Sequence, residues 1–99
     1  MPHSLKLTNG TATLASSILN LPDTFKTPAE IMRAAALVGQ IDAPEKVEQT
    51  AEWASSNERE IALSEQSRDL LKRAVETHAA KLPPNKFTLS LLTQLGFEA

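Results

Sequence analysis

The sequence has no cysteine among its 99 residues. The chain therefore forms no disulfide, offers no thiolate to a metal and has no cysteine nucleophile, which excludes a disulfide-dense secreted scaffold. Glycine is also scarce, and Gly10, Gly39 and Gly96 are scattered along the chain. A phosphate-binding loop needs clustered glycines, because its backbone must approach the phosphates closely. Walker and dinucleotide-binding fingerprints are therefore absent.

Histidine is nearly absent, with only His3 and His78 in the chain. A zinc site needs three or four nitrogen, sulfur or carboxylate ligands, and a serine nucleophile would need His78 as its base. The position of His78 near the end of a predicted helix is explained by the helix dipole or by packing at the core edge. Carboxylates are plentiful between Glu45 and Glu60, but nothing marks two of them as an acid/base pair. We therefore expect no enzymatic activity, no metal and no other cofactor.

Long apolar runs are missing as well. The longest, Ala34 to Val38, is far shorter than the ~18 residues that a membrane span needs. The first six residues lack the apolar core of a secretory signal, so the sequon at Asn9 is expected to be a turn. These features predict a cytoplasmic protein without membrane association.

The residues that are present are typical of one small globular domain. Apolar residues make up 41% of the chain and charged residues 22%, which is ordinary usage. Helical spacing dominates, so we expect a mainly α single domain, a bundle of four or five helices spanning residues 1–99, with residues 1–8 loosely ordered. A short N-terminal β-hairpin or extended segment is left open, and the alternative is an α+β fold with two or three strands.

Residues 27–41 carry the clearest helical pattern. Thr27 is a suitable N-cap, Pro28 fits the first helical position, and Glu30 completes a capping box. Apolar side chains cover more than half of this helix, namely Ile31, Ala34, Ala35, Leu37, Val38 and Ile41. The pattern predicts a helix that is buried on most sides and forms the core element of the fold. Gly39 is either its left-handed cap or an internal residue.

The N-terminal residues fit two structures. Asn9-Gly10 favours a hairpin turn between two short strands. The spacing of Leu14, Ile18 and Leu19 instead predicts a helix that ends at Leu19. We favour the short helix after an extended lead, because an isolated two-stranded hairpin is marginal in water.

The C-terminal half predicts two further helices. The first spans residues 64–82, with Ser64 as its N-cap. Asp69 and Arg73 are one turn apart on this helix and are expected to form an ion pair. The second spans residues 88–95, with Leu89, Leu92 and Leu95 along one side. Gly96 and Phe97 then stand where a Schellman motif ends a helix.

Residues 45–57 fit neither a helix nor a strand clearly, and they belong to an acidic stretch. Residues 44–65 carry six glutamates against Lys46 and Arg59. Trp53 lies in this stretch, and tryptophan is enriched among residues that dominate protein interfaces. We expect Trp53 with Glu48, Glu52 and Glu58 to contact a protein partner or a second copy of the chain. The competing interpretation is that Trp53 covers the core.

The predicted function is accordingly non-enzymatic protein–protein interaction, either within an assembly or as an inhibitor or regulator. The chain is similar in style to small bacteriophage accessory proteins, being short, cysteine-free and helical with an ordered C-terminus, although no motif supports that likeness. No small-molecule ligand is indicated.

The alternative is nucleic-acid binding through a basic face of helix 64–82, formed by Arg68, Lys72 and Arg73. Asp69 and Glu76 interrupt that face, the net charge is −2, and aromatics are only 4% of the chain. A stacking platform needs more aromatic residues than this. Nucleic-acid binding is therefore disfavoured.

Overall fold

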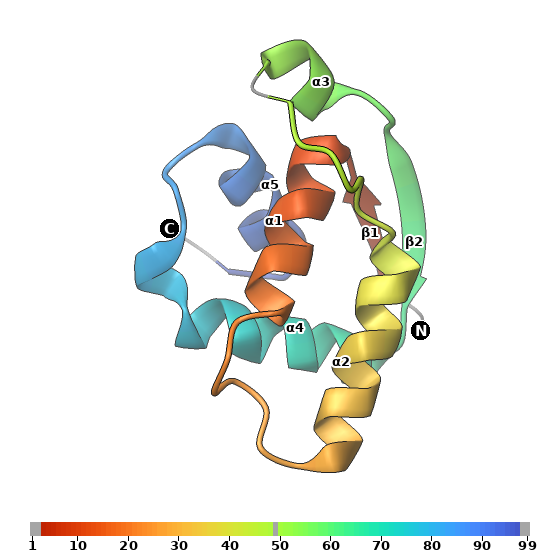
Figure 1. The fold of residues 1–99 in the computed structure, drawn as a ribbon, viewed down its shortest axis with the longest axis vertical. Coiled ribbons are helices and arrows are strands. Elements are labelled where there is room, and N and C mark those ends of the chain that lie inside the picture. The colour runs from red at the N-terminus through yellow and green to blue at the C-terminus, as the bar shows by residue number, and fades with distance from the viewer. Residues whose placement is uncertain (1–2, 49, 98–99) are drawn as a thin grey trace.

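Helix α1 (Asn9–Leu19) lies at the centre of the computed structural model, which describes residues 3–48 and 50–97 (Figure 1). Its neighbours are strand β1 (His3–Leu7) and helices α2 (Pro28–Ile41), α3 (Ala51–Ser55), α4 (Glu65–Thr77) and α5 (Lys86–Gln94). Ala12 and Ala15 are fully buried, and such small side chains let neighbouring elements approach α1 closely. The central helix is therefore α1.

The predicted mainly α fold is confirmed, and the described residues add a two-stranded antiparallel sheet. Strand β1 pairs with β2 (Arg59–Leu63), with Leu5 opposite Ile61 and Lys6 opposite Glu60. The N-terminal hairpin and the loose N-terminus are both wrong for residues 3–8. Thr8 caps α1 by accepting a hydrogen bond from the backbone of Thr11, so the favoured helix forms where the hairpin turn would have been.

The hydrophobic core gathers around α1 from all of these elements except α3. Its largest fully buried side chains come from strand β1 and from three helices, α2, α4 and α5 with its C-cap: Leu5, Leu7, Leu37, Ile41, Leu71, Val75, Leu91 and Leu95. Burying one such side chain stabilises the fold by about 1.5–3 kcal/mol. The strand β1, expected to be loose, is therefore fixed by the burial of two leucines.

The prediction that helix 27–41 is buried on most sides is wrong. Only Ala34, Leu37 and Ile41 are buried, whereas Ile31 is 54% exposed and Met32 73% exposed. Helix α2 lies at the side of the molecule and packs one face against α1 and α4 (Figure 1). Its opposite face meets none of the described residues that form the core.

The ends of α2 follow from its sequence. The Thr27 hydroxyl accepts a hydrogen bond from the Glu30 backbone at 3.2 Å, as the N-cap prediction required. The helix passes through Gly39 to Ile41 and stops at Asp42, which has a left-handed φ of 50°. Gly39 is therefore an internal residue rather than the cap.

The predicted helix 64–82 ends early, at Thr77. A 3₁₀ turn, η1 (Ala79–Lys81), follows it, and Leu82 is extended with ψ of 130°. The residue before a proline disfavours helical backbone, so Pro83 accounts for the extended Leu82, whereas α4 already ends at its C-cap His78, whose φ of −113° and ψ of 24° are not helical. The predicted pair between Asp69 and Arg73 is also wrong, since Arg73 pairs with Glu30 of α2 instead.

The C-terminal helix starts at Lys86, two residues earlier than predicted, because Asn85 caps it by accepting from Phe87 and Thr88. Its predicted stop is confirmed. Gly96 has φ of 92°, and the Phe97 N–H donates to the Leu92 carbonyl at 3.0 Å. Leu89, expected on the packed side, is 65% exposed, and Leu91 is buried in its place.

Candidate functional site

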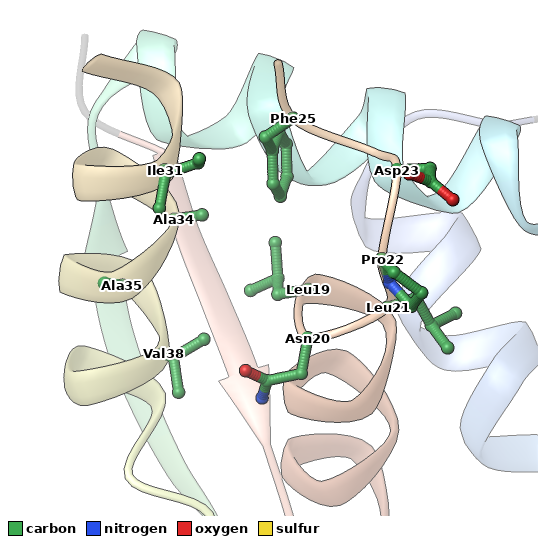
Figure 2. A pocket seen from close by; sticks show the side chains of 10 residues that line it. All are labelled: Leu19, Asn20, Leu21, Pro22, Asp23, Phe25, Ile31, Ala34, Ala35 and Val38. Atoms are coloured by element: carbon green, nitrogen blue, oxygen red, sulfur yellow. The ribbon is translucent and has the colours of Figure 1, made fainter. Parts of the chain in front are cut away.

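A groove of about 420 Å³ lies between the end of α1, the connector of residues 20–27 and α2 (Figure 2). Most of its lining is apolar, with Leu19, Phe25, Ile31, Ala34, Ala35 and Val38. Leu19 and Phe25 point toward one another across it (Figure 2). Asn20 and Asp23 are the polar side chains of the lining. The groove therefore suits an apolar side chain of a partner better than a charged ligand.

The connector that forms one wall is anchored by Thr24, which is buried. Its hydroxyl donates to the Leu21 carbonyl at 3.2 Å and is hydrogen-bonded to Nε2 of His78 at the end of α4. Asp23 turns the chain with a positive φ of 67°, which aspartate tolerates better than most residues. The wall is thus fixed before any partner arrives, and the ring of His78 has a structural hydroxyl as its partner.

A charged pair lies beside Phe25, one of the residues that line the groove. Arg73 of α4 forms an ion pair with Glu30 of α2, and its guanidinium lies 5.5 Å from the centre of the Phe25 ring. The hydrogen bond from Arg73 lowers the pKa of the Glu30 carboxyl below its ordinary value. Phe25 is partly buried, packs against the core and lies under the Arg73 guanidinium.

The outward side of α2 carries a second feature, which we name the outer seam and define as Pro28, Met32, Ala35 and Gly39. All four residues are exposed, and they are spaced four, three and four positions apart. Apolar residues at that spacing form the contact line of paired helices, because its period of 3.5 keeps one face toward the partner. The outer seam contains no charged or hydrogen-bonding side chain, so its contact with water is not stabilised by hydrogen bonds from side chains.

Sequence reasoning missed this surface because it assigned the whole apolar content of α2 to the core. Ile31 and Ala35 were expected to be buried, and both are exposed. The signal was present: the core positions Ala34, Leu37 and Ile41 lie on one side of the helical wheel, and Met32 lies opposite them. Helix α2 is therefore apolar on two opposite sides, of which one is packed against the core and the other is exposed.

Trp53 lies half-buried on α3. It lines a shallow groove of about 270 Å³ together with Leu14 of α1, Phe87 of α5 and the exposed Val47. Its carbonyl accepts a hydrogen bond from the Asn9 side chain at 3.0 Å, which ties α3 to the start of α1. The structure thus gives Trp53 contacts within its own chain, and its role as an interface anchor stays a prediction.

The three glutamates predicted to accompany Trp53 do not gather around it as a site. Glu48 lies in the loop before α3, Glu52 on α3, and Glu58 just before β2, and all three are exposed. Within residues 3–48 and 50–97, no group of three histidine, aspartate or glutamate side chains is arranged to hold a metal ion. A contact between these glutamates and a partner also stays a prediction.

The three residues of the alternative nucleic-acid face contact two different parts of the fold, the C-terminal end after α5 and helix α2. Arg68 donates to the Leu95 carbonyl at 2.9 Å, Lys72 lies 5.3 Å from the Phe97 ring centre, and Arg73 binds Glu30. Phosphate contacts require cations that are free to replace counterions. The structure thus brings these residues onto α4 without forming one free basic face.

No protein-family model, curated protein or solved structure matches this chain. The function must therefore be argued from the surface itself. Of the helices in the described part of the chain, none has the length and apolar character to cross a membrane.

Proposed function

We propose that this protein is a non-enzymatic protein–protein interaction module, and that its docking surface is the outer seam of α2 with the adjoining groove. One observation carries the proposal. Met32 is 73% exposed and Ile31 is 54% exposed on the same helix, next to a groove lined by apolar side chains.

Hydrophobicity explains why this surface favours a partner. Contiguous exposed apolar surface on a small protein commonly marks an interaction site, whereas scattered single residues do not. Leu89 and Val47 are the other large exposed apolar residues of the described chain. Leu89 lies on α5 and Val47 in the loop before α3, whereas Met32 lies on α2. Only α2 combines two such residues with an uncharged line of small ones. Anchoring the groove wall through Thr24 and the Arg73–Glu30 pair lowers the ordering cost of binding.

Site-specific photo-crosslinking tests the proposal. A benzophenone amino acid replaces Met32 in one variant and Leu89 in a control, since both side chains are exposed to a similar extent. In the cells that produce the protein, we expect crosslinked adducts at position 32 that are lost when Ala35→Glu is added. Adducts of equal yield at both positions, or none at position 32, would show that α2 is not a docking surface.

A further inference from the structure

We infer that the partner of α2 is α2 of a second copy of the chain, packed antiparallel about a two-fold axis near Ala35 and Ala36. This inference rests on the proposed function and names its partner. It is carried by the shape of the outer seam, by the charges on one flank of α2 and by the state of the sheet edges.

The shape of the outer seam is complementary to itself when one copy is reversed. Its N-terminal half carries the large side chain of Met32, with Ile31 beside it. Its C-terminal half carries only Ala35 and Gly39, with Ala36 beside them, and all three are exposed. A Cβ atom built at Gly39 meets no other atom within 4 Å, so the space over Gly39 is open. A two-fold axis between positions 35 and 36 places Met32 of each copy over Gly39 of the other.

A parallel pairing does not have this property. It would place Met32 against Met32 and Gly39 against Gly39, which leaves a bulge at one end and a gap at the other. Close packing without gaps supplies the dispersion contacts of a stable interface. The reversed arrangement is also isologous, which is the commonest symmetry of soluble homo-oligomers.

Charge on one flank of α2 supports the same arrangement. Gln40 donates to the Ala62 carbonyl, so this flank faces β2. Arg33 stands seven positions before Gln40, on the same side of α2, and lines a groove with Asp69 of α4. Glu60 is exposed on β2 two residues before Ala62. An antiparallel pair places Arg33 of one copy beside the C-terminal half of α2 in the other copy. On that side of the other copy, strand β2 carries Glu60. Opposite charges at the rim of an interface favour correct orientation more than affinity.

The two edges of the sheet are partly occupied. The Lys6 backbone on β1 is paired with the Gln94 side chain, and the Ala62 carbonyl on β2 with the Gln40 side chain, so strand addition at these positions would have to displace a glutamine. The α2 seam needs no such displacement. Because α2 has only 14 residues, or ~21 Å of axis, its interface is at the small end of specific interfaces, and we expect a dissociation constant on the order of micromolar.

Sedimentation equilibrium over a wide concentration range tests the dimer. We expect the wild-type mass to rise from 10.7 kDa toward twice that value. Met32→Glu should stay at the mass of one chain, because it places a charge in the seam. Leu89→Glu is the matched control, with a similarly exposed apolar residue on α5, and should dimerise like the wild type. A wild-type chain that stays monomeric at millimolar concentration, or a Met32→Glu chain that still dimerises, overturns the inference.

Engineered cysteines test the orientation, and the chain's lack of native cysteine leaves each as the only thiol. Ala36→Cys lies beside the axis and should crosslink to itself on mild oxidation. Ala29→Cys should not, because its two copies lie ~20 Å apart along antiparallel helices and a disulfide needs Cα atoms within ~7 Å. Both variants crosslinking equally would indicate a parallel pair and contradict the inference. If the chain is monomeric but position 32 captures a different protein, the proposed function survives and the two-fold dimer does not.

Discussion

The side-chain amide of Gln94 pairs with the backbone of Lys6 as a neighbouring strand would. Its Oε1 accepts from the Lys6 N–H at 2.6 Å, and its Nε2 donates to the Lys6 carbonyl at 3.0 Å. On the other edge of the sheet, the Gln40 amide donates to the Ala62 carbonyl. Unpaired strand edges invite pairing with other chains. Two glutamines from two helices thus occupy backbone groups on the two edges of a sheet of only two strands.

Gln94→Leu should destabilise the protein by about 1–3 kcal/mol, because two hydrogen bonds of about 0.5–1.5 kcal/mol each are lost. The free energy of unfolding in urea, followed by circular dichroism, measures this. Gln66→Leu on the exposed side of α4 is the control and should change stability by less than ~0.5 kcal/mol. Equal midpoints for the two variants would show that the Gln94 pairing contributes nothing.

Alanine substitution should have opposite effects at two glycines. Gly96→Ala should cost about 1–2 kcal/mol for the left-handed backbone, since φ is 92° and the new Cβ would meet the Arg68 guanidinium at 2.9 Å. Gly39→Ala should stabilise the monomer by about 0.5–1 kcal/mol, because glycine in a helix costs that much relative to alanine. Thermal unfolding at low protein concentration measures both, and two shifts of the same sign would contradict the prediction.

The Glu30–Arg73 pair should make stability depend on acid pH. The pKa of Glu30 is lowered in the folded protein from an ordinary value of 4.5, so the ionised carboxylate favours folding. This contribution is present in full above about pH 4.5 and is lost as the pH falls through the lowered pKa. In the Glu30→Gln variant, the urea midpoint should therefore change less with pH across that window. A concentration of 0.5 M NaCl should weaken the pH dependence of the wild type.

Glu76→Gln is the control for charge alone, because Glu76 is an exposed residue of α4 three positions after Arg73. We expect it to keep the pH dependence of the wild type. An identical flattening in Glu76→Gln and Glu30→Gln would assign the effect to net charge rather than to the pair.

Trp53→Ala should lower the free energy of unfolding by about 1–3 kcal/mol, less than for a fully buried tryptophan, because its half-buried ring packs beside Leu14 and Phe87. The dimer mass at a concentration where the variant is folded should not change, since Trp53 is not part of the outer seam. Unchanged stability together with loss of the dimer would instead support the interface role predicted for Trp53 from the sequence.

Thr88→Val should leave stability unchanged or raise it by about 1 kcal/mol, because the buried Thr88 hydroxyl has no hydrogen-bond partner among the described residues and an unmet buried group is costly. Thr13→Val is the matched control, since its hydroxyl donates to the Asn9 carbonyl at 2.8 Å, and it should be destabilising. Chemical denaturation of the two variants side by side distinguishes them. A destabilised Thr88→Val would imply a partner for that hydroxyl, such as a bound water.

The sequence by itself determined where several helices of this fold begin and end. The caps at Thr27 and Ser64 and the stop at Gly96 depend on hydrogen bonds between residues three to five positions apart. A cap supplies hydrogen-bond partners to backbone groups within about one turn of a helix end, so these helix ends could be predicted from neighbouring residues. The predicted short helix that ends at Leu19 formed for the same reason, with Thr8 as its cap.

Only the tertiary structure decided which helix is central and which apolar surface stays exposed. Helical periodicity shows that Ile31 and Met32 are apolar but not what lies across from them, and burial depends on elements far away in the chain. Strand His3–Leu7 pairs with Arg59–Leu63, and Glu30 pairs with Arg73; both contacts span more than forty residues. A local pattern cannot choose among such contacts, because their energy depends on how the whole chain packs. The outer seam of α2 became visible only once α1 had taken the centre.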